Sequence, residues 1–265
     1  MAGFAQDGEM AASPSSDFGV GMRRCPLPGH GQVHVWLVHQ DRISDRRTFV
    51  ECRDILSSGE RARARRFFRE PDSRLYTAAH ALMRTTLSRY LGKDPHDWVF
   101  ATSSTGKPMP VLAEGSPPVH VSISHTAGLA ACALATQGPV GVDVEVRQRG
   151  ILDAALLAST LCPDEIESFR GIGTADRVDR FFEIWTLKEA YLKARGYGVA
   201  FGMSRFGFLF DGEGRPRLSL PGVRSADTAT WRFSLHRPTS SHQAAVALRN
   251  IDGELDVEWR CADPI

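Results

Sequence analysis

Three carboxylates in two separate segments have the types and the spacing that suit a metal ion. Asp143 and Glu145 alternate with valines in the segment Val140–Val146, and this alternation predicts a strand. Because side chains alternate faces along a strand, the two carboxylates point the same way, about 6–7 Å apart, and the valines line a buried face. The third carboxylate, Glu189, lies in a segment that predicts a helix. Carboxylates this close repel one another unless water or a cation lies between them.

A set of three oxygen ligands favours a hard cation. Mg²⁺ prefers oxygen donors, keeps part of its water shell and binds phosphate oxygens, and Mn²⁺ is the alternative because it accepts the same donors. Lys188 and Lys193 flank Glu189, as a site that handles phosphate requires. Each pattern alone has a plainer interpretation, since Asp-x-Glu on a strand is usually a solvated face and Glu189 with Lys193 is usually a helix-surface ion pair. The combination favours the metal site.

This combination resembles the signature of the 4′-phosphopantetheinyl transferases, in the Sfp-type branch. The strand carries the family's G-[IV]-D-x-E pattern from Gly141 to Glu145, and the helix carries W-[ST]-x-K-E-[AS]-x-x-K from Trp185 to Lys193. Three further family segments occur in the expected order: a basic stretch ending in R-R-F at residues 57–67, a G-K-P turn at residues 106–108, and a strand ending in S-x-S-H at residues 121–125. Each motif alone is weak, whereas five in order are specific.

The resemblance implies a reaction. The phosphopantetheine arm of coenzyme A moves onto a serine hydroxyl of an apo acyl carrier protein or peptidyl carrier domain. The serine oxygen attacks the β-phosphate, and adenosine 3′,5′-bisphosphate leaves. Phosphoryl transfer depends mainly on positioning and on neutralising charge, which suits Mg²⁺ flanked by lysines. The implied partners are therefore coenzyme A and an apo carrier protein.

The resemblance also implies roles for individual residues. Asp143, Glu145 and Glu189 would bind Mg²⁺, and Glu189 would also orient or deprotonate the serine, directly or through a metal-bound water. Glu165 is the rival base, although an acidic residue in the first turn of a helix is its plainer interpretation. Lys188 either contacts the pyrophosphate or pairs with a carboxylate. The other contacts expected with coenzyme A are those of Lys193 with the pyrophosphate, Ser124 and His125 with a phosphate, Lys107 and Arg63 with the 3′-phosphate, and Arg74 with the adenine end.

Composition limits the classes of function. The 265 residues are 42% apolar and 24% charged, with a net charge of +1, so nothing indicates a general attraction to nucleic acid or to a membrane. Five scattered cysteines without zinc-binding spacing predict reduced thiols in the cytoplasm. No run of residues approaches the ~20 apolar residues of a membrane span. Positive charge is concentrated locally, in a run that usually forms a solvated helix face: Arg61, Arg63, Arg65, Arg66 and Arg69.

The chain is predicted to divide at a turn around Gly138. We expect residues 1–21 to be a disordered extension, residues 22–137 to form an N-terminal α+β half, and residues 138–265 to form a C-terminal α+β half that carries the metal site. Strands are predicted at residues 33–38, 98–100, 119–124, 129–135, 140–146, 231–236 and 243–248. Helices are predicted at residues 61–68, from a cap at Asp72 or Ser73 to Leu91, from Pro163, and at residues 176–195.

The two halves look alike in sequence, because each contains a long helix closed by a glycine and a similar strand–turn–strand unit. The family resemblance implies the same arrangement, with two α+β halves about a pseudo-two-fold axis, the active site in the cleft between them, and a monomer.

Two other functions fit the same residues. One is a different Mg²⁺-dependent phosphate enzyme, such as a hydrolase of nucleotides or coenzyme A, which would keep the metal and need no carrier. The other is a non-catalytic protein that binds carriers or nucleotides, which loss of a carboxylate would favour. All three carboxylates are present.

Overall fold

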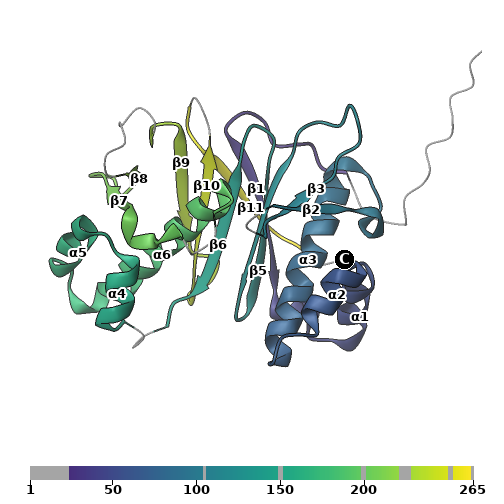
Figure 1. Cartoon of the computed structure of the whole chain (residues 1–265), viewed down its shortest axis with the longest axis horizontal. Helices are drawn as coiled ribbons and strands as arrows, with labels where there is room; N and C mark the ends of the chain where they lie inside the picture. Colours follow the sequence, from purple (N-terminus) through teal and green to yellow (C-terminus); the bar gives the residue numbers. More distant parts are fainter. Residues whose placement is uncertain are drawn as a thin grey trace, which may run out of the picture.

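The computed structural model describes residues 24–103, 106–148, 152–197, 201–220, 228–249 and 253–263. Two β-sheets form the centre of the molecule, and helices cover the outer face of each (Figure 1). This mixture confirms the predicted α+β class. The predicted disordered tail, residues 1–21, lies outside the described residues. No helix within the described ranges is both long and apolar enough to span a membrane.

The two central sheets contain seven of the strands. The first sheet has the order β11-β1-β5-β4 and consists of β1 (Gln32–His39), β4 (His120–Thr126), β5 (Leu129–Ala135) and β11 (Asp256–Cys261). The second has the order β6-β10-β9 and consists of β6 (Val140–Val146), β9 (Trp231–His236) and β10 (His242–Arg249). Two separate hairpins are formed by β2 (Phe100–Thr102) with β3 (Pro108–Pro110), and by β7 (Gly207–Phe210) with β8 (Pro216–Ser219). Neighbouring strands are antiparallel except for β1 and β11.

The helices fall into two groups along the chain. Those before β4 are η1 (Gln40–Ile43), α1 (Arg46–Asp54), α2 (Ser58–Ala64), α3 (Glu70–Leu91) and η2 (Pro95–Asp97). Those after β6 are α4 (Ala154–Thr160), α5 (Pro163–Arg170), α6 (Thr174–Arg195) and η4 (Met203–Arg205). The two long helices, α3 and α6, end as predicted at Gly92 and Gly196, which have φ values of 71° and 68°. Glycine is favoured there because other residues are strained in the left-handed conformation.

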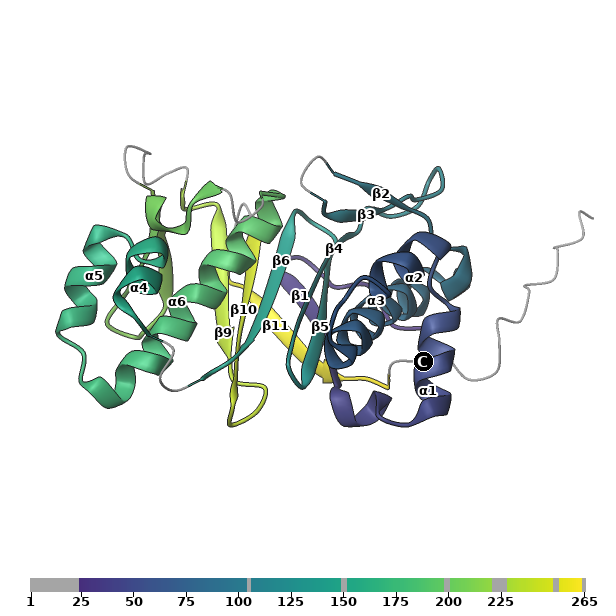
Figure 2. The ribbon, with the colours of Figure 1, turned by 60° about the horizontal axis from the view of Figure 1, so that its bottom comes forward.

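The apolar core has one layer between the sheets and one outside each sheet. Val140, Val142 and Val144 of β6 pack in the central layer with the inner faces of β1, β5 and β10. α3 packs on the outer face of the first sheet, and α6 packs on β6 and β10 (Figure 2). The valine face of β6 is therefore buried as predicted, and the opposite face of this strand, with Asp143, lies toward α6.

The two sheets meet along β4 and β6 through side chains. The hydroxyl oxygens of Ser122 and Ser124 accept hydrogen bonds from the backbone N–H groups of Val142 and Val144, at 3.1 and 3.4 Å. Strands β9 and β11 meet where His236 stacks on Trp259, with ring centroids 4.4 Å apart. The first of these junctions brings the end of the S-x-S-H strand beside the carboxylates of β6.

Several predicted boundaries were wrong by one to four residues, among them the starts of α2, α3 and β2. α2 begins at Ser58, because Ser57 and Glu60 form a capping box before it. α3 begins at Glu70, since Pro71 occupies its first turn, where a missing N–H is tolerated. β2 begins at Phe100, two residues later than predicted.

The last strand, β11, pairs with a strand on the other side of the predicted boundary between residues 137 and 138. β11 lies beside β1 in the first sheet, with Val33 opposite Val257 and Val35 opposite Trp259. The segment from residue 138 onward therefore contributes to both sheets. A pairing between segments more than 200 residues apart leaves no local pattern in the sequence.

Candidate active site

Asp143 lies at the centre of a hydrogen-bonded group where β4, β6 and α6 meet. Its Oδ1 accepts hydrogen bonds from Ser124 Oγ at 2.9 Å and from Lys193 Nζ at 2.7 Å. Lys193 Nζ also donates to Ser124 Oγ at 2.8 Å. Asp143 Oδ2 is buried and has no hydrogen-bond partner among the described residues. A buried carboxylate oxygen without a partner is costly, so this atom is suited to a positively charged ligand.

Gly141 explains how α6 approaches β6 so closely. A Cβ atom at this position would lie 1.9 Å from the carbonyl oxygen of Ala190 and 2.6 Å from the amide nitrogen of Ala194. Any side chain would therefore push the helix away from the strand. The glycine of the strand motif thus lets the helix bring Lys193 to Asp143.

Burial raises the pKa values of the three carboxylates, and the negative charge of Asp143 adds to the rise at Glu145 and Glu189. Burial raises the pKa of Glu145 to about 7, and the negative charge of Asp143 contributes to this rise. Glu145 accepts hydrogen bonds from the Trp185 indole and the Thr126 hydroxyl, both at 3.3 Å, and these oppose the shift. Burial also raises the pKa of Glu189, and the negative charge of Asp143 makes the next largest contribution to this rise. Burial raises the pKa of Asp143 despite the ammonium group of Lys193. Shifts of this kind gather at functional sites.

The donor set fits a hard cation. Among the residues that the structure describes, no three histidine, cysteine, aspartate or glutamate side chains are gathered closely enough to hold a metal ion. Asp143 nevertheless has an unpartnered buried oxygen, and Glu145 and Glu189 have raised pKa values that a divalent cation would lower. Mg²⁺ at Asp143, Glu145 and Glu189 therefore stays a prediction that these oxygens suit.

Two further predicted residues lie next to this group. Burial lowers the pKa of His125 to about 4, with a contribution from Lys193, so this imidazole is neutral at pH 7. Lys107 Nζ donates to the carbonyl oxygens of Val140 at 3.1 Å and Lys193 at 2.8 Å. Burial lowers the pKa of Lys107 to about 8, again with a contribution from Lys193. The G-K-P turn thus brings a cation to the C-terminal end of α6.

Sequence reasoning missed an ion-pair network that joins α2 to α3. Glu60 accepts hydrogen bonds from Arg84 at 2.7 and 3.0 Å, and its other oxygen lies 3.1 Å from His80 Nδ1. Arg84 is 1% exposed and also donates to the carbonyl oxygens of Pro95 and Trp98, both at 3.0 Å. Although burial opposes the change, hydrogen bonds from His80, Ser57 and Arg84 lower the pKa of Glu60 to about 2. The acidic residue within the arginine run is therefore an anchor for α2.

Glu165 and Lys188 lie outside the carboxylate group. Their side chains are 1% and 0% exposed and form an ion pair of 2.5 Å. Lys188 Nζ also donates to three carbonyl oxygens, those of Thr160 at 2.7 Å, Met203 at 2.9 Å and Phe206 at 2.7 Å. Glu165 also accepts the N–H groups of Cys162 and Phe208, both at 2.8 Å. Lys188 therefore pairs with a carboxylate, and the side chain of Glu165 is buried in the same ion pair.

The two predicted arginines have different surroundings. Arg74 donates to the carbonyl oxygens of Ile43 and Ser44, at 2.5 and 3.0 Å, and its guanidinium group lies over the ring of Phe49. Arg74 thus joins α3 to η1 and α1, and its contact with the adenine end stays a prediction. Arg63 is exposed, and its guanidinium group forms no hydrogen bond or ion pair with another described residue.

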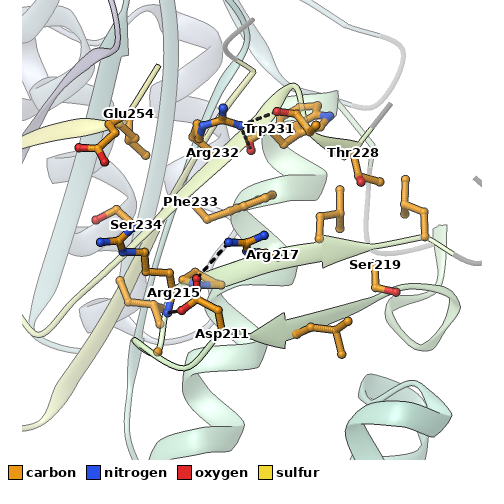
Figure 3. A pocket seen from close by; sticks show the side chains of 18 of the residues that line it. Asp211, Arg215, Arg217, Ser219, Thr228, Trp231, Arg232, Phe233, Ser234 and Glu254 are labelled. Carbon is orange, nitrogen blue, oxygen red and sulfur yellow. Dashed lines mark hydrogen bonds and ion pairs between the residues drawn. The ribbon is translucent and has the colours of Figure 1, made fainter. Parts of the chain in front are cut away.

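An apolar cavity of about 190 Å³ opens beside Glu145. Its walls are mainly four apolar side chains of α4 and α6, together with Thr126: Leu156, Phe181, Phe182 and Trp185. A larger hollow of about 1180 Å³ lies between the β7–β8 hairpin and β9 (Figure 3). Asp143, Glu145 and Glu189 do not line it, and its Arg217 forms an ion pair with Asp211 at 3.3 Å. The smaller cavity is the one in contact with the candidate site.

Comparisons with known proteins show the family of this chain. The 4′-phosphopantetheinyl transferase superfamily matches residues 139–247, and the N-terminal domain of 4′-phosphopantetheinyl transferases matches residues 44–137. The 4′-phosphopantetheinyl transferase HetI of Nostoc sp. is 34% identical over 170 residues, which cover 64% of this chain and 70% of that protein. A phosphopantetheinyl transferase of Thraustochytrium sp. is 30% identical over 220 residues, 78% of this chain and 75% of that protein. The 4′-phosphopantetheinyl transferase Sfp of Bacillus subtilis is 26% identical over 194 residues, 73% and 84% of the two chains.

Proposed function

We infer the reaction of this protein from its family, because the chain belongs to the 4′-phosphopantetheinyl transferase superfamily. It transfers the 4′-phosphopantetheine group of coenzyme A to a serine of an apo carrier protein, giving holo carrier and adenosine 3′,5′-bisphosphate. The observation that carries this inference is the group of Asp143, Lys193 and Ser124, since it joins three of the family's motifs within hydrogen-bonding distance.

The side chains of the site suit the transfer of a phosphoryl group. Lys193 would neutralise the negative charge that develops on the phosphate oxygens during the transfer. His125, which is neutral, can donate its N–H to a phosphate. Glu189 would take the proton of the serine hydroxyl. The serine oxygen then bonds to the β-phosphorus, whose bond to the departing bisphosphate breaks. Mg²⁺ held by Asp143, Glu145 and Glu189 would supply positive charge to the pyrophosphate.

The cavity beside Glu145 fits the phosphopantetheine arm. The arm extends from the phosphate that is attacked, so a site for it must begin next to the carboxylates. The cavity begins there, and its walls of Leu156, Phe181, Phe182 and Trp185 suit the apolar part of a flexible chain.

Intact-mass spectrometry of an apo carrier protein tests the proposed function directly. The carrier is incubated with this protein, coenzyme A and Mg²⁺, with a parallel sample that contains EDTA. We expect a mass increase equal to one phosphopantetheine that requires the metal. If coenzyme A is hydrolysed while fatty-acid, peptide and polyketide carriers all stay unmodified, the hydrolase is the correct function. If coenzyme A is only bound, the protein is non-catalytic.

The raised pKa of Glu145 predicts that Mg²⁺ affinity depends on pH. We expect the affinity to weaken as the pH falls from about 8 to 6, by up to about tenfold per unit below 7, because a proton competes with the metal for this carboxylate. Isothermal titration calorimetry with Mg²⁺ at several pH values measures this affinity. Without the metal, the raised pKa stabilises the fold at low pH, and that contribution is lost as the pH rises through about 7.

Glu145→Gln is the matched control for this pH dependence. It removes the titrating group, and its amide oxygen can still accept the hydrogen bond of the Trp185 indole while its amide NH₂ group faces the Thr126 hydroxyl oxygen. The variant should bind Mg²⁺ more weakly at every pH, with a flatter profile between pH 6 and 8. An affinity of the wild-type protein that stays constant over this range would exclude Glu145 as a ligand.

Several expectations about partners stay predictions of the sequence. The acceptor is an acyl carrier protein or a peptidyl carrier domain, and the protein acts as a cytoplasmic monomer that binds neither nucleic acid nor a membrane.

A further inference from the structure

The connection between α2 and α3 exposes the ring of Phe68 beside three arginines that form no ion pair with another described residue. Phe68 has an exposed fraction of 102%, the highest among the exposed large apolar side chains. Arg65, Arg66 and Arg69 are also exposed, and none of their guanidinium groups forms an ion pair or hydrogen bond within the described part of the chain. We call these four residues the Phe68 patch. Its charge is local, because the whole chain has a net charge of only +1.

The connection is held firmly by the residues on either side of Phe68. Ala64 is buried, and its carbonyl oxygen accepts a hydrogen bond from Ser73 Oγ at 2.9 Å. The ring of Phe67 packs on Tyr76 of α3, with centroids 5.3 Å apart. Because its neighbour Phe67 packs on α3, Phe68 is directed to solvent. A ring presented by an anchored segment loses little conformational freedom when it binds a partner.

The patch lies close to the candidate active site. Tyr76, on which Phe67 packs, is edge-on to His125 at a centroid distance of 6.5 Å. His125 follows Ser124 on β4, and Ser124 Oγ accepts a hydrogen bond from Lys193 Nζ at 2.8 Å. The segment that carries the Phe68 patch is thus joined to the candidate site through Phe67, Tyr76 and His125.

We propose that the Phe68 patch is a docking surface for the carrier protein, through an acidic face of the carrier with an apolar recess for the Phe68 ring. The proposal rests on the proposed function, which requires a protein that brings a serine to Glu189. The three arginines, which form no ion pair with another residue that the structure describes, attract an acidic surface and speed the encounter. An aromatic anchor ringed by polar side chains is the typical arrangement of a binding hot spot. Nucleic acid and anionic lipid also attract arginines, but neither supplies the serine that the reaction needs.

Steady-state kinetics of Phe68→Ala and Arg66→Glu test the proposal. We expect each substitution to raise the KM for the apo carrier about tenfold, with kcat and the KM for coenzyme A within about twofold of wild type. The effect of Arg66→Glu should shrink at high salt, because salt screens exposed charges. The melting temperature of Phe68→Ala should be unchanged, since its side chain is fully exposed. Matched controls are Arg46→Glu, which makes the same charge change on exposed α1, and Leu209→Ala, which removes another exposed apolar side chain; both should keep the wild-type KM.

The possible results separate the two proposals. If the wild-type protein modifies no carrier, the proposed function fails, and the docking proposal fails with it. If it modifies the carrier and both variants keep the wild-type KM for the carrier, the docking proposal alone is overturned. Binding to single-stranded RNA and to vesicles that contain phosphatidylserine is measured in parallel. If Phe68→Ala weakens binding to RNA alone or to vesicles alone, and leaves the KM for the carrier unchanged, the Phe68 patch binds that ligand and the docking proposal is overturned.

Discussion

Asp143→Asn is expected to lower the rate of phosphopantetheine transfer by at least about 100-fold while the protein stays folded. The substitution keeps an oxygen that accepts hydrogen bonds from Ser124 and Lys193. It removes the negative charge at the unpartnered Oδ2 atom, on which the affinity for a divalent cation depends. Mass spectrometry of the carrier gives the rate, and circular dichroism with thermal unfolding shows whether the fold is intact.

Asp211→Asn is the matched control, because Asp211 is an ion-paired aspartate next to β7, outside the candidate site. This variant should transfer at the wild-type rate. A wild-type rate for Asp143→Asn in a folded protein would remove Asp143 from the site, and with it the proposed metal set.

Glu165→Gln and Lys188→Met are expected to lower the free energy of unfolding strongly, by about 3–5 kcal/mol each. Each substitution leaves the other charge buried without its partner, because both side chains are almost completely excluded from solvent. For the protein that remains folded, kcat should stay within a few-fold of wild type, since neither side chain reaches a substrate. Urea unfolding measures the free energy, and initial rates per folded molecule measure kcat.

The double variant Glu165→Gln with Lys188→Met separates the charge effect from the packing effect. It contains no isolated buried charge, and the amide oxygen of the introduced glutamine would still accept a backbone N–H, so we expect it to be more stable than Lys188→Met alone. If Glu165→Gln instead lowers kcat more than about 100-fold with an unchanged free energy of unfolding, Glu165 is the base after all.

Local patterns in the sequence were sufficient to predict the long helices and the central strands β4, β5, β6, β9 and β10. The alternation of valines predicted β6 to the residue, and two glycines predicted the ends of α3 and α6. These features depend on neighbours within a few positions, which the sequence displays directly. The motifs also selected Ser124, Asp143 and Lys193, three residues that the structure brings within hydrogen-bonding distance.

Only the tertiary structure decided which charged residues face the site. Glu165 and Lys188 occur within or near the motifs, yet they pair with each other in the interior. Arg74 is bound to the carbonyl oxygens that end η1, and Glu60 is bound to Arg84. The parallel pairing of β11 with β1 was likewise invisible in the sequence. A residue type shows what a side chain can bind, whereas its partner depends on distances between segments that are remote along the chain, and only packing of the whole fold sets those distances.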